Sequence, residues 1–269
     1  MIERSSTPPA NRDFDAHGFV ASTTQTGRVD YANPNGFNFS VSSLENMTAA
    51  EKDSERQRIV VRYWQLEQEL ATPLTAIVNG DGSRMVKLNE GHGGAQSLLR
   101  ADAVVLDSKS GGALMVFADC IPCIIVGPGR AALLHCGWRN LVAGIIPTTI
   151  QHLGLPSERT KIYLGPHAKQ LDFDVDTSGL ESDFLKEHKQ QIQPIDQGRI
   201  RINLSAIALT QLLDRGILPK NITVSSADTQ HDPRYYSHRN RYQKANVTGQ
   251  SNPGGRFAVM LSVGQLETR

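Results

Sequence analysis

Residues 123–136 read CIIVGPGRAALLHC. Two apolar runs flank the turn residues Gly-Pro-Gly-Arg, and such a break between β-rich runs predicts an antiparallel hairpin. In that hairpin the paired residue numbers sum to about 257, because the turn fixes the register. His135 then lies opposite Pro122, and Cys120 lies opposite Gly137. We therefore expect the Cys120 and His135 side chains within about one diagonal of each other, on the order of 7–8 Å.

The segments around this hairpin predict an α/β domain of mixed sheets flanked by helices. Residues 1–16 are polar and contain prolines, so we expect a poorly ordered tail followed by one domain over 17–269. Apolar, β-branched runs predict strands, and apolar residues at helical spacing predict helices. Strands are expected within 17–43, on both sides of 80–83 within 76–88, and at 103–107, 113–118, 161–164, 222–226 and 257–263; helices are expected at 48–69, 141–153, 182–189 and 204–215.

Composition excludes several classes of partner. The chain has 269 residues, and 39% of them are hydrophobic, which is enough to bury a core. Its 28 basic and 27 acidic residues nearly cancel, so we expect no nucleic-acid or anionic-membrane partner. No apolar run approaches the roughly 20 residues that span a bilayer, and no signal-peptide pattern opens the chain. Three cysteines suggest no disulfide framework. These features predict a cytoplasmic protein and leave the oligomeric state open, while a small-molecule substrate is implied only by the family resemblance described below.

Cys120 and His135 form the candidate reactive pair. A thiol and an imidazole at this separation can share a metal ion or act as nucleophile and base. A structural role stays open, because cysteine is among the most buried residue types. Strand alternation turns Cys123 and Cys136 to the opposite face, which argues against one site holding all three sulfurs. The Cys-Ile-Pro-Cys run is no thioredoxin motif, since it leads into a strand, and a zinc ribbon would need a second cysteine pair.

Arg139 is a candidate anion ligand just beyond the hairpin. It follows Gly137 and stands where a helix is expected to begin, so exposed backbone N–H donors lie nearby. A guanidinium there could hold a phosphate through two hydrogen bonds. The alternative is an ordinary surface arginine in a strand-to-helix turn.

Several motifs carry a resemblance to a known family. Residues 118–122 read ADCIP and residues 134–139 read LHCGWR. They resemble the A-D-C-x-P and H-A-G-W-R-G motifs of the laccase-domain family, whose members are called multicopper polyphenol oxidoreductases or purine nucleoside phosphorylases. The resemblance covers roughly residues 17–265 and keeps its order along the chain. Further matches are GFNF at 36–39, RADA at 100–103, LGPH at 164–167, YSHR at 236–239 and GRFA at 255–258.

The resemblance implies a laccase-domain (YfiH-like cysteine hydrolase) fold and a catalytic zinc held by two histidines and one cysteine. It further implies phosphorolysis of purine nucleosides or deamination of adenosine, with Cys120, His135 and Arg139 as catalytic residues and phosphate near Arg139. Copper is not expected, because the eight histidines are scattered and contain no His-x-His pair. The resemblance also carries over a set of substrate-binding positions, namely Asn38, Asn79, His167, Tyr236 and Arg239.

One departure concerns the metal. The family places its first histidine ligand in a Q-V-H-G segment, whereas residues 77–80 read IVNG, so Asn79 stands in place of that histidine. An amide oxygen is a poor zinc ligand beside imidazole. We therefore expect Cys120 and His135 to hold zinc weakly or not at all, unless His92 from a glycine-rich loop supplies the missing donor. Other departures are Cys136 for alanine, Asn140 for glycine and His238 for tyrosine.

Two classes of function therefore stay open. One is an enzyme with a remodelled site, either a nucleoside phosphorylase or deaminase of the family type or a hydrolase or amidase that uses Cys120 and His135. The other is a family member that has lost catalysis and binds a ligand or a protein partner.

Overall fold

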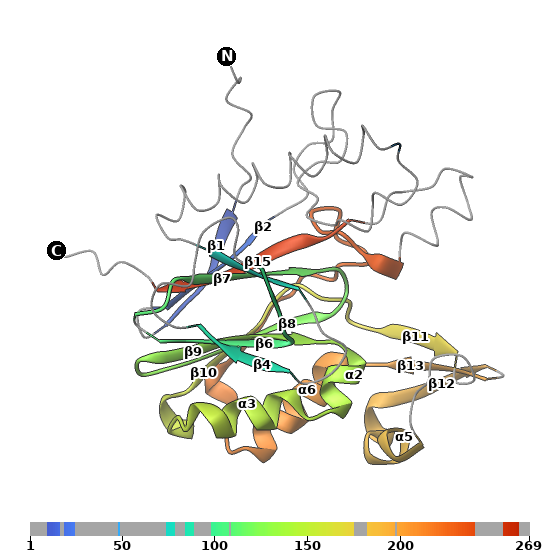
Figure 1. Cartoon of the computed structure of the whole chain (residues 1–269). Helices are drawn as coiled ribbons and strands as arrows, with labels where there is room; N and C mark the ends of the chain where they lie inside the picture. The colour runs from blue at the N-terminus through green and yellow to red at the C-terminus, as the bar shows by residue number, and fades with distance from the viewer. Residues whose placement is uncertain are drawn as a thin grey trace.

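A computed structural model of the protein describes residues 10–16, 19–24, 48, 74–78, 84–88, 98–107, 109–174, 182–196, 198–239 and 255–263. Two six-stranded sheets lie face to face, and helices cover the outer face of the second sheet (Figure 1). A three-stranded sheet extends from one end of this stack. Parallel and antiparallel pairs occur in both large sheets, so the mixed α/β architecture is confirmed.

The central hairpin joins β8 (Ile121–Gly127) to β9 (Arg130–Cys136). Its antiparallel register places Pro122 opposite His135 and Gly127 opposite Arg130, as the turn predicts. All seven residues of β8 are buried, because one face packs on helices and the other packs on the first sheet. Such a strand has no polar face, which explains its continuous apolar run.

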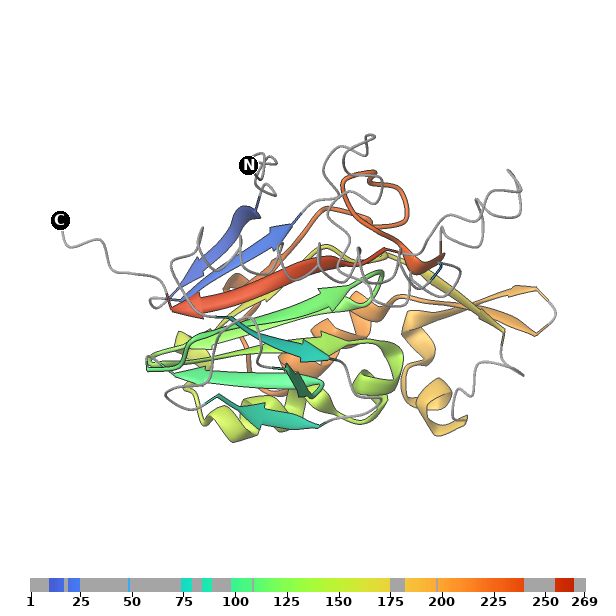
Figure 2. The ribbon, with the colours of Figure 1, turned by 45° about the horizontal axis from the view of Figure 1, so that its top comes forward.

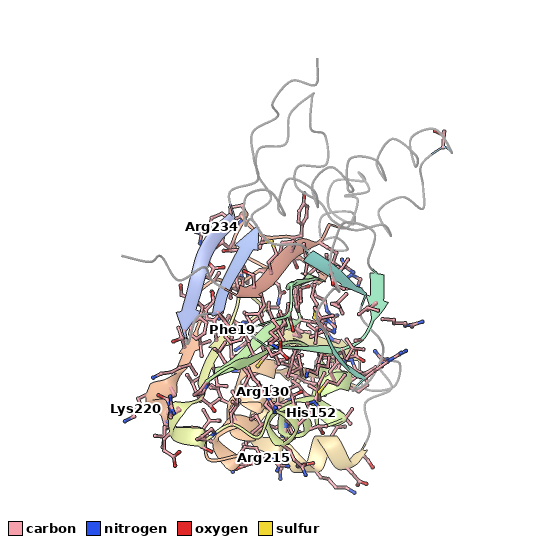
Figure 3. The ribbon with its side chains drawn as sticks, turned by 60° about the vertical axis from the view of Figure 1, so that its left-hand side comes forward. Phe19, Arg130, His152, Arg215, Lys220 and Arg234 are labelled. Carbon is pink, nitrogen blue, oxygen red and sulfur yellow. The ribbon has the colours of Figure 1, made fainter. Side chains whose placement is uncertain are left out.

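The first sheet covers one face of the hairpin. Its apolar residues, together with Ile124 and Val126 of β8, form one core cluster between the two sheets. Phe19 belongs to this cluster, and Figure 3 shows it inside the molecule while Lys220 and Arg215 lie at the periphery. In order across this sheet the strands are β1 (Ala10–Ala16), β2 (Phe19–Thr24), β15 (Phe257–Val263), β7 (Gly112–Phe117), β3 (Leu74–Val78) and β5 (Leu98–Arg100).

The second sheet contains the hairpin at its centre, and Figure 2 shows it stacked below the first sheet. The predicted strand pair around 80–83 is divided between the two sheets, since β3 lies in the first and β4 in the second. In order the strands of the second sheet are β14 (Ile222–Val224), β10 (Lys161–Leu164), β8, β9, β6 (Ala103–Asp107) and β4 (Met85–Lys87).

Three helices cover the outer face of the second sheet. The single helix expected over 141–153 is wrong, because two helices occupy this stretch: α2 (Trp138–Val142) and α3 (Ile145–Leu153). Gly144 lies between them with a φ of 70°. Pro147 gives the physical reason, since a proline inside a continuous helix would clash with the carbonyl group of Ala143. In the first turn of α3 the same proline is tolerated.

The remaining helix of this layer is α6 (Leu204–Asp214), which begins at Asn203. The Asn203 side chain accepts a hydrogen bond of 2.9 Å from the main-chain N–H of Ala206, and this satisfies one donor of the first turn. The residues that α2, α3 and α6 bury pack on the alternate residues of the hairpin, Cys123 and Ile125 among them. Three short 3-10 helices complete the layer: η2 (Ser157–Arg159), η3 (Lys189–Gln191) and η4 (Pro219–Asn221).

The third sheet was not expected from the sequence. Its strands are short and mostly half-exposed, so they carry little of the apolar signal that marks the others. The sheet consists of β11 (Leu171–Asp174), β13 (Arg199–Ile202) and β12 (Ile192–Asp196), in that order.

α5 (Ser182–Glu187) ends two residues before residue 189, where the predicted helix was expected to end.

The N-terminal strands extend the first sheet. Ala10–Ala16 forms β1, so ordered structure begins before residue 17, where the domain is expected to start. The Phe14 ring stacks on Tyr163 with 5.5 Å between ring centroids, which anchors this strand to the second sheet. The predicted helix over 48–69 lies outside the described residues, apart from Thr48. None of the described helices is long and apolar enough to cross a bilayer.

Candidate functional site

Cys120 and His135 meet beside Gly137 at the end of the hairpin. A Cβ atom placed on Gly137 would lie 3.1 Å from the Cys120 Sγ and 3.6 Å from the His135 Cε1. A side chain at position 137 would force the sulfur to shift by a few tenths of an ångström, so glycine suits this close approach. Both side chains line one cavity of about 380 Å³. The predicted proximity of the two residues is therefore confirmed, while their catalytic role stays a prediction.

His135 is held from two directions. Its main-chain N–H donates a hydrogen bond of 2.8 Å to the carbonyl oxygen of Asp102. Its ring packs at a tilt against Phe117 of β7, with 5.6 Å between the ring centroids. The imidazole thus lies at the edge of the core between the two sheets, where its orientation is restricted before any ligand arrives.

Asp119 ties the cysteine to a distant part of the chain. Its φ is 79°, and no other non-glycine residue among those described has a positive φ. Its buried carboxylate accepts hydrogen bonds from the hydroxyls of Thr229 at 2.7 Å and Ser237 at 3.1 Å, and from the main-chain N–H of Arg239 at 2.8 Å. A backbone held in this region costs about 1–2 kcal/mol, and the carboxylate's bonds offset that cost.

Sequence reasoning assigned no function to Asp119. The one signal for Asp119 in the sequence is its place in the ADCIP segment, directly before Cys120. Its three partners are more than a hundred positions away along the chain. Only the fold shows that this carboxylate places the 229–239 segment over the cysteine.

The start of α2 is organised by Asn140, the residue that replaces the family's glycine. The Asn140 Oδ1 accepts a 3.2 Å hydrogen bond from the Gly137 N–H, and its Nδ2 donates a 3.0 Å bond to Asp102. Asp102 is buried and also accepts a bond of 3.1 Å from the Arg84 N–H. This departure from the family pattern therefore closes the first turn of α2 and fastens it to Asp102, the residue before β6.

Two arginines face the cavity. The Arg139 guanidinium lies over the Trp138 ring, 4.3 Å from its centroid, so its plane is oriented by the indole. Arg256 donates a 2.9 Å hydrogen bond to the carbonyl oxygen of Gly255. The described lining of the cavity contains no carboxylate. Both arginines thus bring positive charge to the cavity, while the anion-binding role expected for Arg139 stays a prediction.

The predicted segment 236–239 divides between two cavities. His238 lines the cavity that contains Cys120, whereas Arg239 lines a larger neighbouring one. The Tyr236 ring covers Gly255 so closely that a Cβ atom on Gly255 would lie 1.9 Å from it. Tyr236 thus packs the 236–239 segment against the strand that brings in Arg256. The described residues that line the Cys120 cavity are Val116, Ala118, Cys120, His135, Gly137, Trp138, Arg139, Asn140, His238 and Arg256.

His167 lies apart from this cavity. It is fully buried, and its Nδ1 is 2.7 Å from the carbonyl oxygen of Gly165. It is absent from the lining of the Cys120 cavity, and its substrate-binding role stays a prediction. The other predicted site residues, Asn38, Asn79 and His92, lie outside the described residues.

The Cys120 thiol is protonated at neutral pH. Burial and the neighbouring Asp119 raise its pKa to about 12, although Arg256 and Arg239 act in the opposite direction. A cysteine nucleophile needs a depressed pKa. This environment therefore disfavours a Cys120 thiolate acting by itself on an ester or amide.

The other two cysteines lie on the helix side of the hairpin. Cys123 and Cys136 are fully buried and belong to the core cluster under α2, α3 and α6. Burial and a hydrogen bond of the Cys136 thiol with Cys123 raise the pKa of Cys136 well above its ordinary value. Neither residue lines the Cys120 cavity, so the predicted separation of the three sulfurs is confirmed.

A zinc ion in this cavity would need a third protein ligand beside Cys120 and His135. Cys120, His135 and His238 share a cavity, but the described part of the chain has no group of three His, Cys, Asp or Glu side chains arranged to hold a metal ion. A catalytic zinc site takes three protein ligands. The described residues therefore do not fit zinc as they stand, and the weakening expected from Asn79 stays a prediction.

Comparison with known proteins assigns the class. Over residues 19–260 the chain matches the family described as multi-copper polyphenol oxidoreductase laccase, and it belongs to that family. It is 25% identical over 249 residues to a purine nucleoside phosphorylase of Pseudomonas aeruginosa, covering 89% of this chain and 90% of the relative. It is 26% identical to a purine nucleoside phosphorylase of Haemophilus influenzae, covering 78% of this chain and 83% of the relative.

Solved structures show the same fold. YfiH of Bacillus licheniformis superposes with a TM-score of 0.72 at 18% identity, covering 95% of this chain and 99% of that one. YlmD of Geobacillus stearothermophilus superposes with a TM-score of 0.72 at 19% identity, covering 92% and 93%. The expected laccase-domain fold is therefore confirmed.

Proposed function

We propose that the protein is a purine nucleoside phosphorylase whose substrates meet in the Cys120 cavity. The observation that carries the proposal is that His135, Arg139 and Arg256 line one cavity of about 380 Å³. The described lining of this cavity contains no carboxylate. The family's relatives named purine nucleoside phosphorylase support the same reaction. A cavity of this size suits a small ligand.

In this reaction a phosphate oxygen attacks the ribose C1′ while the bond from C1′ to the purine nitrogen breaks. The proton that the phosphate gives up ends on the departing purine. We assign phosphate binding to Arg139 and Arg256, because guanidinium groups hold phosphate oxygens through paired hydrogen bonds. We assign the proton transfer to His135, because a neutral imidazole can accept and return a proton near pH 7.

Zinc enters no step of this proposal. The described residues supply Cys120 and His135 as donors but no third ligand in place. When bound in such a family site, zinc would supply an activated water for deamination. Adenosine deamination therefore depends on a donor from outside the described residues, while phosphorolysis needs only the arginines and the histidine.

The test measures release of the purine base from inosine and adenosine by protein purified without a histidine tag. Arg139→Ala is expected to raise the phosphate KM by tenfold or more, since one charged contact to phosphate contributes about 1.5–3 kcal/mol. Arg215→Ala, an exposed arginine outside the cavity, is the matched control and should behave as the wild type. Phosphate-independent turnover, or no base release at all, would overturn the proposal.

A second candidate is a protein that binds such ligands without turning them over. It is favoured by the protonated Cys120 thiol and by the absence of a three-ligand metal group among the described residues. Asn79→His distinguishes the two. If only this variant takes up stoichiometric zinc and gains turnover, the natural chain is a binding protein; if the wild type already turns over, the enzyme proposal stands.

A further inference from the structure

A second cavity lies next to the site just described. Its volume is about 630 Å³, and it is formed where the third sheet meets the 228–239 segment. This sheet extends beyond the two large sheets on the right of Figure 1. The charged side chains of its lining are four basic residues and two carboxylates: Lys169, Arg199, Arg201, Arg239, Asp172 and Asp228.

Lys169 is fixed in place by buried neighbours. Burial lowers the pKa of His167 to about 4, so this imidazole is neutral at physiological pH. Its Nδ1–H donates to the Gly165 carbonyl oxygen at 2.7 Å, which leaves Nε2 as an acceptor for the Lys169 ammonium at 3.5 Å. The ammonium also donates to the carbonyl oxygen of Ser225. An ammonium has three N–H donors, so one remains for a ligand.

Carboxylates cancel only part of this positive charge. Arg199 forms an ion pair with Asp196, which lies outside the lining. Asp172 is engaged by Arg201 through bonds of 2.7 and 3.1 Å. Asp228 accepts from the His231 ring at 2.8 Å. A guanidinium has five N–H donors, and Arg201 uses two of them in its hydrogen bonds to Asp172. The lining therefore keeps an excess of basic side chains, with donors unspent on Arg201 and Lys169.

Arg239 connects this cavity with the Cys120 cavity. Its main-chain N–H is bonded to Asp119, next to Cys120, while its guanidinium lies 4.8 Å from the ring centroid of Phe173 in β11. Its charge acts on both Cys120 and Asp172, lowering the pKa of each. His238, the residue before it, lines the Cys120 cavity. One short segment thus borders both sites.

We propose that the basic cavity binds a phosphate ester group, so that the two cavities together hold a purine nucleotide more tightly than the free nucleoside. The inference rests on the proposed function for the purine end of that ligand. The phosphate would lie among Lys169, Arg201 and Arg239. A dianion suits the site, because it would receive hydrogen bonds from a held ammonium and from guanidinium groups at once.

The experiment is calorimetric titration at low ionic strength with three probes: adenosine, adenosine 5′-monophosphate and inorganic phosphate. The monophosphate should bind the wild type at least tenfold more tightly than adenosine, and added salt should reduce the difference. Lys169→Met should weaken monophosphate binding by tenfold or more, since it removes one charged contact. Lys220→Met removes an exposed charge elsewhere and should bind as the wild type.

The control arms separate this inference from the proposed function. Lys169→Arg keeps the charge and should retain most of the affinity; if Lys169→Met fails to fold, Arg201→Gln replaces it. If inorganic phosphate no longer binds to Arg139→Ala but still binds to Lys169→Met, that phosphate binds in the Cys120 cavity and not in the basic cavity. Equal affinity for adenosine and its monophosphate, or an unchanged Lys169→Met variant, overturns the inference. Failure of the proposed function appears differently, as tight monophosphate binding without any release of base.

Discussion

The two cavities are built on different principles. The Cys120 cavity is formed by a short stretch, residues 116–140, together with His238 and Arg256 from late segments. Most of its described lining is apolar or neutral, and aromatic neighbours orient His135 and Arg139. The basic cavity collects residues from 169–173, 199–201 and 228–239, and nearly all its lining is charged or polar.

This difference shows how each site obtains its specificity. The first cavity relies on close approach, as at Gly137, where a single Cβ atom would meet the Cys120 sulfur. The second relies on charge, with Lys169 and Arg201 held by partners but retaining donors. Asp119 and Arg239 join the two, so changes at these residues affect both sites, whereas changes elsewhere affect one.

The largest expected effect concerns the Cys120 thiol. With a pKa of about 12, its thiolate fraction should rise tenfold per pH unit from pH 8 to 10 without levelling. Its alkylation by iodoacetamide, followed peptide by peptide in the mass spectrometer, should show this slope. At pH 8 the folded protein should react at least a hundredfold more slowly than the protein in denaturant. A plateau near pH 9 would show that the cavity leaves the thiol unperturbed.

The next effect concerns the junction of the two cavities. Asp119→Ala should lower the free energy of unfolding by about 3 kcal/mol or more, because three donors lose their acceptor. Asp119→Gly also lacks the carboxylate, but glycine adopts this φ without strain. It should therefore be about 1–2 kcal/mol more stable than Asp119→Ala. Both variants should impair ligand binding in both cavities. Urea unfolding within 0.5 kcal/mol of the wild type for either variant would contradict this role.

The smallest effect concerns the basic cavity alone. Asp172→Asn should cost less than about 1 kcal/mol of stability, because the ion pair with Arg201 is about 40% exposed. Arg201 lowers the pKa of Asp172, so the contribution is present at neutral pH and is lost as the pH falls below about 4. Urea melts of wild type and variant should therefore converge at acid pH. A loss that persists there would point to packing instead of charge.

Much of the fold follows from local patterns. The Gly-Pro-Gly-Arg turn sets the β8–β9 register by itself, since a turn between two apolar runs admits one pairing that buries both. Strands β6 and β10 have the predicted bounds for the same reason, being continuous apolar runs. The helix prediction over 141–153 failed because the apolar spacing continues through Gly144 and Pro147, and spacing alone does not show the missing N–H of a proline.

By itself the sequence determined the family, because its motifs keep their order along the chain. It also determined the central hairpin and the meeting of Cys120 with His135, because one tight turn fixes that pairing. Tertiary structure decided what no local pattern contains. The role of Asp119 depends on partners more than a hundred residues away, and the basic cavity exists because β11, β13 and the 228–239 segment converge. Hydrogen bonds and charges act over a few ångströms of space, and separation along the chain does not reveal that distance.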